Sequence, residues 1–251
     1  MTKKGIFWFT TDLRLDDNQA LKQAAATVDQ LVLVYCPEES ERLSNFQIGS
    51  SISANRHEFL IRSLMDLQKS LAPLGQHIII CPQPVTALSQ IILNYGINYV
   101  FRSGGQHCLD SSSWDCLKTT HPSVEFTEIG SNRLFNRQQL PFELSELPSS
   151  FSKFRRKAEK IGVLPPEPAV TRLPPTIMDP ILWPADFAKS RVRDSMIFEG
   201  GETSARSHLK NYFSSSLAST YKQTRNGLDG MDYSTKFSPW LASGCISVRR
   251  I

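Results

Sequence analysis

The sequence is poor in long apolar runs and in paired cysteines. The run near the N-terminus, Gly5–Phe9, is too short for a signal-peptide core, and no stretch approaches the ~18 apolar residues of a membrane-spanning helix. The five cysteines are odd in number and scattered, with neither a C-x-x-C pair nor a second Cys/His pair at zinc-ligand spacing. We therefore expect no membrane association, reduced thiols and a cytoplasmic protein.

Common nucleotide and hydrolase motifs are also missing. The turn after the first apolar run reads "TTDLRLDD" and contains no glycine, which argues against a Rossmann-type NAD site there. The sequence has no Walker A motif, no G-x-S-x-G elbow and no histidine pair at metal-ligand spacing. On this basis we assign no catalytic residue and no metal ligand.

The composition is that of a globular protein. The 251 residues are 40% hydrophobic and 21% charged, which is enough to bury a substantial core. The net charge is +4 and the isoelectric point about 8.8. This mildly basic balance is compatible with a phosphate-bearing ligand or a nucleic acid, but does not by itself indicate one.

Residues 1–130 alternate between predicted strands and helices. Asp16 or Asp17 is expected to cap the first helix, an amphipathic stretch runs from Ser53 to Leu71, Thr86 is expected to cap a third helix, and a weaker one surrounds Trp114–Thr119. This order predicts an α/β fold, a doubly wound five-stranded parallel sheet with helices on both faces. The five apolar runs predicted as strands are Gly5–Phe9, Leu31–Tyr35, His77–Cys81, Asn98–Arg102 and Ser123–Ile129.

The pattern changes after residue 130. Residues 131–197 read as an interdomain linker, because Pro165–Pro184 contains too many prolines for a helix or a central strand. We expect this stretch to be extended and to lie across both flanking parts. Residues 198–251 begin a helical domain, and Gly200–Gly227 reads as helix with one shared apolar face, formed by Ala205, Leu209, Tyr212, Phe213 and Leu217.

The stretch "DYSTKFSPWLASGC" has the composition of an anion-binding loop that leads into a helix. Ser238 suits the N-cap, Pro239 the first helical position and Gly244 the position after the end, which predicts a short helix over Pro239–Ser243. Ser234, Thr235 and Lys236 add hydroxyl groups and a cation. The pattern fits a phosphate or pyrophosphate site, and it also fits an ordinary capped turn.

Several long motifs resemble the photolyase/cryptochrome family. The stretch "YKQTRNGLDGMDYSTKFSPWLASGCISVRRI" (Tyr221–Ile251) resembles the start of the family's flavin-binding domain, and "FEGGETSARSHLKNYF" (Phe198–Phe213) resembles the helix that enters it. The segments "WFTTDLRLDDNQAL" and "LPFELSELPSSFSKFRRKAEK", with "TRNG" and "KFSPWLASGC", are most similar to the cryptochrome DASH branch. The resemblance extends along the whole chain.

The resemblance implies a Rossmann-like antenna domain followed by a helical domain that holds FAD. Tyr221 matches a tyrosine near the flavin's ribityl-phosphate region, and Ser234, Thr235, Lys236, Phe237 and Ser238 match the loop around the pyrophosphate. The implied activity is blue-light-dependent repair of pyrimidine dimers in single-stranded DNA, by a photolyase, or blue-light reception. The implied partner is DNA that contains pyrimidine dimers.

Two departures from the family pattern concern the first domain. Thr10 stands where the family usually has arginine. A folate antenna (MTHF) in this branch is held partly by an acidic residue after the fourth strand, and the corresponding stretch "SGGQHCLDSSSW" offers only Asp110.

The last residues begin an element that the sequence does not complete. Ser247 is expected to cap a helix of which Val248–Ile251 forms a single turn, too little for a stable helix. We therefore interpret the chain as an N-terminal portion of a longer flavoprotein, with an incomplete FAD-binding domain. We expect this portion to be inactive, to bind FAD weakly or not at all, and to self-associate through an exposed face of the helix Gly200–Tyr221. The alternative is a non-catalytic α/β nucleotide-binding or partner-docking module.

Two clusters of charged residues fit either a structural role or a ligand-binding role. Asp12, Arg14 and Asp16 could orient a ligand at the edge of the sheet, although a local ion pair with a helix cap explains them as well. The basic stretch Arg155–Lys157 could bind phosphate groups, but we interpret it first as a basic surface that faces solvent.

Overall fold

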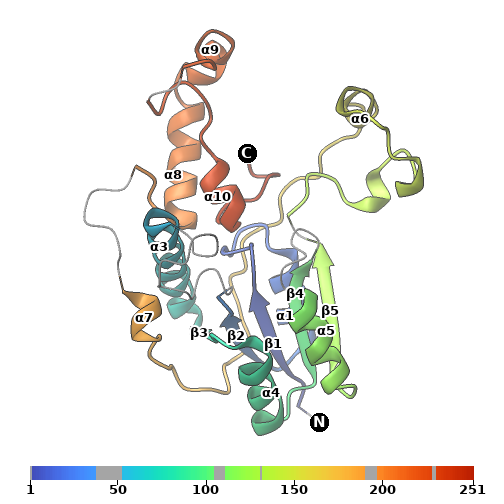
Figure 1. The fold of residues 1–251 in the computed structure, drawn as a ribbon, viewed down its shortest axis with the longest axis vertical. Helices are drawn as coiled ribbons and strands as arrows, with labels where there is room; N and C mark the ends of the chain where they lie inside the picture. Colours follow the sequence, from blue (N-terminus) through green and yellow to red (C-terminus); the bar gives the residue numbers. More distant parts are fainter. Residues whose placement is uncertain (1, 38–52, 105–110, 131, 190–196, 228–229) are drawn as a thin grey trace.

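The computed structural model describes residues 2–37, 53–104, 111–130, 132–189, 197–227 and 230–251. A parallel sheet with strand order β3-β2-β1-β4-β5 forms the centre of the first domain (Figure 1). The predicted doubly wound five-stranded parallel sheet is therefore confirmed. Its strands are β1 (Lys4–Phe9), β2 (Gln30–Tyr35), β3 (Ile78–Ile80), β4 (Tyr99–Gly104) and β5 (Glu125–Gly130).

Strand β1 lies at the middle of the sheet and is buried on both faces. It pairs with β2 on one side and with β4 on the other, both in parallel. Successive side chains of a strand point to opposite faces, so Phe7 and Phe9 enter one hydrophobic cluster, whereas Ile6 and Trp8 enter a second one. This two-sided burial explains why the first strand reads as an uninterrupted apolar run.

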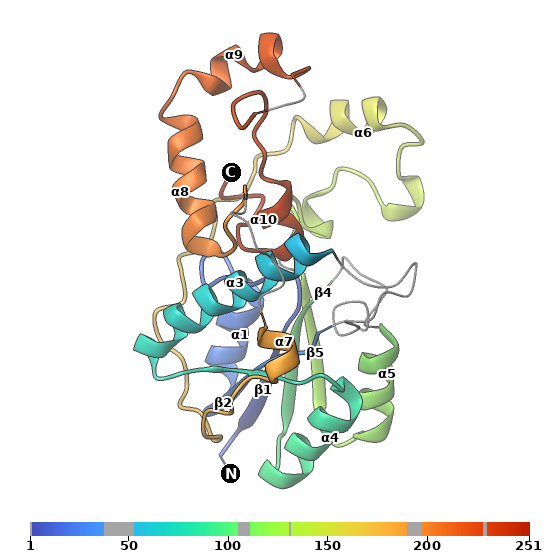
Figure 2. The same cartoon turned by 60° about the vertical axis from the view of Figure 1, so that its left-hand side comes forward.

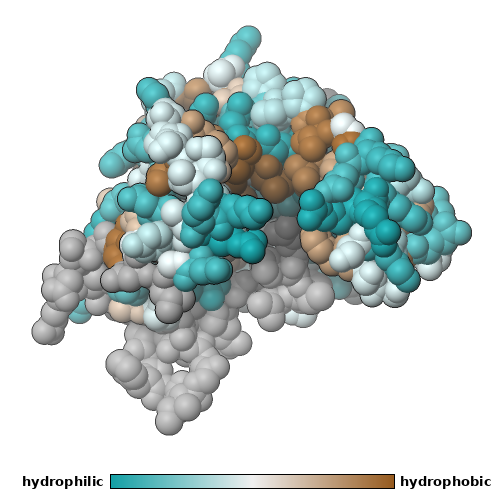
Figure 3. Space-filling view, turned by 90° about the horizontal axis from the view of Figure 1, so that it is seen from above, coloured by the Kyte–Doolittle hydropathy of each residue, from teal (hydrophilic) through white to brown (hydrophobic). Residues whose placement is uncertain are grey.

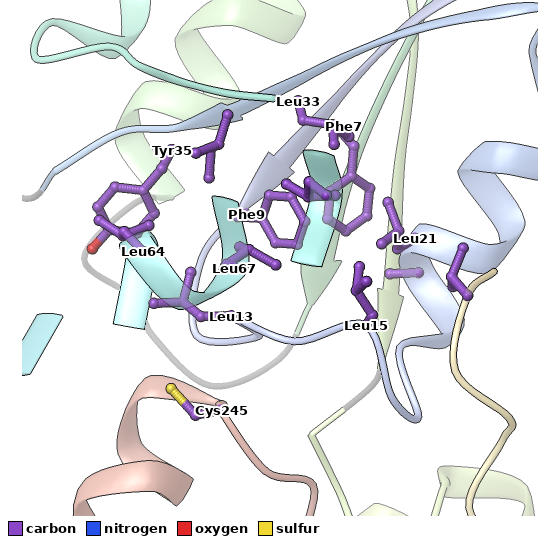
Figure 4. Packing of buried hydrophobic residues seen from close by; sticks show 14 of the residues in the cluster. Phe7, Phe9, Leu13, Leu15, Leu21, Leu33, Tyr35, Leu64, Leu67 and Cys245 are labelled. Carbon is purple, nitrogen blue, oxygen red and sulfur yellow. The ribbon is translucent and has the colours of Figure 1, made fainter. Parts of the chain in front are cut away.

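Helices α1 (Gln19–Thr27) and α3 (Ala54–Leu71) cover the face of the sheet that carries Phe7 and Phe9. Leu64 and Leu67 of α3 join the two phenylalanines in this cluster: Figure 4 shows Leu67 beside Phe9, Leu64 toward Tyr35 and Leu21 of α1 on the side of Phe7. The apolar stripe predicted for α3 is buried as expected. A single 3₁₀ turn, Ala72–Leu74, follows α3.

Helices α4 (Pro84–Tyr95) and α5 (Ser111–Thr120) cover the opposite face (Figure 2). Trp114 of α5 packs against Trp8 with ring centroids 6.2 Å apart, and Leu88 of α4 is fully buried in the same cluster. Helices on both faces are the layer arrangement that the strand–helix alternation predicts.

The expected helix starts are wrong at two places. Asn18, and not Asp16 or Asp17, caps α1: its side-chain oxygen accepts from the Leu21 amide at 3.0 Å. Helix α4 begins at Pro84 instead of after Thr86, because proline in the first helical position needs no amide partner.

The segment that follows the sheet contains little regular structure. It includes two 3₁₀ turns (Arg137–Gln139 and Leu144–Glu146), α6 (Phe151–Ala158) and α7 (Ala185–Ala188). Residues 163–184 contain no helix or strand, as the prolines predict. This connector is bound to the first domain: the Leu31 amide donates to the Pro175 carbonyl at 3.0 Å, and Trp183 Nε1 donates to the Ile78 carbonyl at 3.2 Å.

The C-terminal part is helical but divided. It consists of α8 (Glu202–Phe213), α9 (Leu217–Thr224) and α10 (Ser238–Ser243). The helix expected over Gly200–Gly227 is interrupted at residues 214–216, three consecutive serines. The Ser215 hydroxyl donates to the Tyr212 carbonyl at 2.7 Å, so a side chain occupies a backbone acceptor at the break. Among the helices that the structure describes, none is both long and apolar enough to cross a membrane.

Candidate functional site

The candidate anion-binding loop, residues 234–238, connects the end of the α9 region to α10. His208 of α8 holds it: its Nε2 lies 2.8 Å from the Thr235 carbonyl oxygen. Phe237 is buried, and its ring packs against His208 at 5.0 Å and against Phe213 at 6.5 Å between centroids. Lys236 has a φ of 52°, a left-handed backbone that sharpens the turn between these two anchors.

Ser238 does not cap the short helix as expected. Helix α10 begins at Ser238 itself, Phe237 occupies the cap position, and no side chain caps the helix. The exposed Ser238 hydroxyl is therefore not used by the helix. Gly244 follows the end of α10 with a φ of 67°, as its place in the sequence predicts.

Within the described part of the chain, the polar side chains of the loop have no bonding partner. There, the side chains of Ser234, Thr235, Lys236 and Ser238 make no hydrogen bond or ion pair with another residue. Hydroxyl groups and an ammonium group on a fixed turn are the donors that a phosphate or pyrophosphate accepts from. The chemistry of the loop therefore fits an anion.

Tyr221 is not brought to this loop. It lies on α9, its side chain is 42% exposed, and among the described residues it makes no hydrogen bond or ring contact with residues 234–238. The connection between α9 and the loop runs through Thr224, whose hydroxyl donates to the Tyr233 carbonyl at 3.4 Å. The structure thus groups five of the six predicted site residues and leaves Tyr221 apart from them.

Sequence reasoning missed His208 as an anchor of the loop. Its ring stacks on Trp240 of α10 at 4.9 Å while its Nε2 contacts the loop. The signal was available in the helical spacing, because His208 lies three residues after Ala205 and four before Tyr212, on the face predicted to be buried.

A second polar cluster joins the turn after β1 to the C-terminal segment. Arg14 is fully buried, and its guanidinium donates to the backbone carbonyls of Asp16 at 2.9 Å, Asp17 at 3.1 Å and Gly244 at 2.8 Å. Burial lowers the pKa of the Arg14 guanidinium, and the nearby carboxylates of Asp12 and Asp17 oppose that effect. Arg14 therefore fixes the turn and contacts the residue that follows α10 through backbone carbonyls.

Acidic side chains of the same turn bind the last residues of the chain. Arg250 donates to both carboxylate oxygens of Asp16, each at 2.6 Å, and Arg249 forms a two-point contact with the fully buried carboxylate of Asp17. Both are charge-assisted, bidentate pairs. Hydrogen bonding to Asp16 raises the pKa of the Arg250 guanidinium.

Glu202 at the start of α8 completes this cluster. Its carboxylate accepts from the Leu15 amide at 2.7 Å and from the Asp16 amide at 3.2 Å. Burial raises the pKa of Glu202, since the charged form loses hydration. The first turn is thus held by α8 from one side and by residues 244–250 from the other.

Gly244 and Cys245 lie in direct contact with the first domain. A Cβ at Gly244 would overlap the Thr11 carbonyl, so only glycine permits this approach. Cys245 points from the C-terminal segment toward Leu13 (Figure 4). Burial raises the pKa of its thiol to about 11, which makes it an unreactive packing group.

Polar side chains lie near the carboxyl ends of β1 and β4, the edge at which ligands bind in doubly wound sheets. Ser103 donates to Asp12 at 2.5 Å, and Asn132 donates to the Thr11 carbonyl. Burial raises the pKa of Asp12. Asp110, the acidic residue considered for a folate antenna, lies outside the described residues.

An apolar groove of about 670 Å³ separates the linker from the C-terminal part. Seen from above, apolar surface lies between two raised, mostly hydrophilic parts of the molecule (Figure 3). Side chains from residues 134–154 and from α10 and the segment after it line the groove, among them Leu134, Phe135, Phe154, Leu241, Ile246 and Val248.

Comparison with known proteins identifies the family. The family model described as DNA photolyase matches residues 5–174, more than half of the chain, and the chain belongs to this family. Similar proteins include a cryptochrome DASH of Vibrio parahaemolyticus, 38% identical over all of this chain and 57% of the relative's length. Another is the cryptochrome DASH of Synechocystis sp., 32% identical over 98% of this chain and 53% of the relative. The likeness to the cryptochrome DASH branch is therefore confirmed.

Solved structures agree with this assignment. The crystal structure of a Synechocystis sp. cryptochrome is 29% identical with a TM-score of 0.87, over 100% of this chain and 55% of that one. An archaeal photolyase from Sulfolobus tokodaii, 18% identical with a TM-score of 0.74, shares the fold. The chain spans a little over half the length of the relatives it matches.

Proposed function

We propose that this chain supplies the α/β domain and the pyrophosphate-binding loop of a cryptochrome DASH-type flavoprotein. The proposed activity of the whole protein is blue-light-dependent repair of pyrimidine dimers in single-stranded DNA, or blue-light reception. Family membership and the named relatives support this proposal, with DNA that contains pyrimidine dimers as the proposed partner.

One observation carries the cofactor part of the proposal. The loop 234–238 is fixed at two points, by His208 and by the buried Phe237, while its own side-chain donors make no bonds within the described residues. A turn that is anchored but has unused donors is preorganised for an anionic ligand, because little order is lost on binding.

The residues present fit the pyrophosphate of FAD. Ser234, Thr235 and Ser238 would donate hydroxyl hydrogen bonds, and Lys236 would supply a positive charge. Phe237 would hold the backbone of the loop, and Tyr221, by its match to the family, would lie beside the ribityl-phosphate region. When bound, reduced FAD supplies an electron on absorbing blue light.

We expect the affinity of this chain for FAD to be weak. Thr235, Ser238 and Tyr221 are exposed, so the loop offers one wall, whereas tight ligand sites enclose most of the ligand surface. This is also the basis for expecting no repair activity from the chain by itself.

The test must therefore detect weak binding. We propose to titrate the ¹⁵N-labelled chain with millimolar FAD and, separately, with riboflavin, which lacks the pyrophosphate, and to follow the backbone amide signals. We expect FAD to shift the amides of residues 233–238 and riboflavin to leave them unchanged, because the loop recognises the phosphates.

Two variants sharpen this experiment. Lys236→Gln removes the proposed phosphate contact and should abolish most of the FAD-induced shift. Lys210→Gln removes an exposed lysine from α8, outside the loop, and should leave the shift intact. Equal shifts with FAD and riboflavin, or an unaltered response of Lys236→Gln, would contradict the proposal.

We also propose the division of the chain into residues 1–130, 131–197 and 198–251. The extended connector without helix or strand at 163–184 supports it. Limited proteolysis should cut first within 131–197, and early cleavage inside α3 or α8 would argue against these boundaries.

Self-association through apolar surface and a cytoplasmic location are further parts of the proposal. Ala205 and Tyr212 of the expected helical face are buried, but Phe213 is 49% exposed and supports a role for this face. Sedimentation velocity over a range of concentrations should show oligomers that Phe213→Ser weakens, and a concentration-independent monomer would count against self-association.

The free thiols of the described cysteines support a reducing compartment, which is consistent with the proposed cytoplasmic location.

A further inference from the structure

The linker carries a basic hollow that the flavin site does not use. It has a volume of about 780 Å³ and lies between residues 141–149 and helix α6. Four cations line it, against one acidic side chain, Glu146: Lys153, Arg156, Lys157 and Lys160. We call this feature the basic hollow.

Three of the four cations, Lys153, Arg156 and Lys157, share one side of α6 because of their spacing, and Lys160 lies in the turn that follows the helix. The three stand at positions i, i+3 and i+4, which fall on one face of a helix of 3.6 residues per turn. Phe154, on the other side, lines the apolar groove instead. Helix α6 is therefore amphipathic, with its charged side turned into the basic hollow and its apolar side turned toward the C-terminal part.

The charge of the basic hollow is not neutralised within the described part of the chain. Glu159 forms its ion pair with Arg155, outside the four, and none of the four forms an ion pair with a described carboxylate. Lys157 is positioned by the ring of Phe142, with its Nζ 5.1 Å from the centroid.

The charge is also concentrated in this part of the sequence. Residues 131–160 contain seven Lys and Arg against three Glu, a net charge of +4 that equals the net charge of the whole chain. The remainder of the protein is therefore neutral on balance, and the excess positive charge that can attract a polyanion lies in residues 131–160.

We propose that the basic hollow binds the phosphate backbone of a single-stranded nucleic acid, a contact separate from the flavin site. The eight residues of α6 extend about 12 Å along the helix axis, which corresponds to roughly three nucleotides of a stacked strand. The same segment exposes Leu147 (56%) and Phe151 (75%), apolar side chains that unpaired bases can contact and that bases inside a duplex cannot. The choice of a nucleic acid among phosphate polymers rests on the proposed function.

The experiment measures binding of fluorescein-labelled oligothymidylate to the chain by fluorescence anisotropy, in the dark and without flavin. The double substitution Lys153→Gln/Lys157→Gln should weaken binding by about tenfold at low salt. It should also reduce the slope of log K against log salt by about 1.4, since each phosphate contact in a single strand contributes about 0.7. Far-UV circular dichroism and the Tm check that the variants fold.

Matched variants test whether the position of the charge matters. Lys69→Gln/Lys118→Gln removes the same charge from exposed sites on α3 and α5 and should leave both the affinity and the slope almost unchanged. Glu146→Gln removes the acidic side chain from the basic hollow and should strengthen binding. Equal weakening by the two lysine pairs would overturn the proposal, because it would reduce the effect to net charge.

Competition experiments show which kind of polyanion the basic hollow prefers. Unlabelled oligothymidylate should displace the probe at lower concentration than a duplex or inorganic polyphosphate of equal phosphate content, and Phe151→Ala should remove part of this preference. Displacement by polyphosphate as effective as by oligothymidylate would overturn the assignment to nucleic acid. Because the probe contains no pyrimidine dimer and no flavin is present, these outcomes are independent of the Lys236→Gln test of the flavin loop.

Discussion

Arg250 donates two hydrogen bonds of 2.6 Å to the carboxylate of Asp16, a residue 234 positions earlier in the sequence. The neighbouring pair, Arg249 and Asp17, repeats the arrangement. Together with the contact of Arg14 to the Gly244 carbonyl, these bonds make the first turn and the last residues one polar unit. The candidate flavin loop ends at Ser238, six residues before Gly244, so its position depends on this unit.

The Asp17–Arg249 pair should contribute strongly to stability. Asp17 is fully buried, and besides Arg249 its carboxylate accepts from the Glu167 amide at 2.8 Å. Asp17→Asn leaves Arg249, whose side chain is 7% exposed, without its counter-charge, and should lower the free energy of unfolding in urea by about 3–5 kcal/mol. The control, Glu159→Gln, breaks an exposed pair with Arg155 and should cost less than about 1 kcal/mol. Similar losses for both would contradict this account.

Gly244 should be far less tolerant of a side chain than other glycines with a similar backbone. Gly244→Ala must overcome both a φ of 67° and overlap with the Thr11 carbonyl, and we expect a loss of more than about 3 kcal/mol. Gly96→Ala has a comparable φ of 64° but open space around it, so it should cost about 1 kcal/mol. Urea unfolding measures the loss of stability in each variant. An equal loss in the two would show that overlap with the Thr11 carbonyl adds nothing to the cost of the Gly244 substitution.

The buried carboxyl of Glu202 should make stability depend on pH in a defined direction. Burial raises its pKa above the ordinary value of 4.5, so the folded protein binds this proton more tightly than the unfolded chain does. Its contribution to the free energy of unfolding is then present below pH 4.5 and is lost as the pH rises through the raised pKa. Urea unfolding of the wild type and Glu202→Gln across this range should reveal a difference that falls with rising pH.

Glu202→Gln should also be less stable than the wild type at low pH. The amide group can accept from only one of the two backbone amides, of Leu15 and Asp16, which leaves a buried donor unpaired at a cost of about 1–3 kcal/mol. Glu199→Gln, which changes an exposed carboxylate paired with Arg62, is the control and should show neither effect. A pH-independent difference between wild type and Glu202→Gln would refute the raised pKa.

Cys245 should resist alkylation while Cys116 reacts. At pH 8 a thiol whose pKa is about 11 is ionised in roughly one molecule in a thousand, and Cys245 is also fully buried. Cys116 is exposed on α5. Iodoacetamide followed by peptide mass spectrometry should find Cys116 modified and Cys245 unmodified until urea is added. Equal rates for the two thiols would mean that the C-terminal segment opens readily.

The sheet was predictable because its information is local. Each apolar run, such as Gly5–Phe9, is hydrophobic enough to indicate a buried strand without reference to distant residues. The alternation with helices then restricts the topology to a parallel sheet. The helix caps were less predictable: Asp16 and Asp17 have suitable side chains, but Arg249 and Arg250 bind them. No local pattern reports a partner more than 230 residues away.

The loop was predictable in composition but not in geometry. The hydroxyl groups and Lys236 could be read directly, whereas the anchoring of the turn by His208 depends on α8 packing against α10. The break at residues 214–216 redirects α9, and Tyr221 consequently lies apart from the loop. The cofactor roles of these residues stay predictions that the FAD titration addresses.

The connection between the first turn and the last residues has a consequence for biosynthesis. Arg14 and Asp17 acquire their partners Gly244 and Arg249 only after at least 230 further residues have been synthesised and the C-terminal segment has left the exit tunnel. Until then, the turn after the central strand lacks the contacts of Arg14 with Gly244 and of Asp17 with Arg249. Such large sequence separation slows folding, and nascent chains of this protein should depend on holding chaperones longer than the local regularity of the sheet implies.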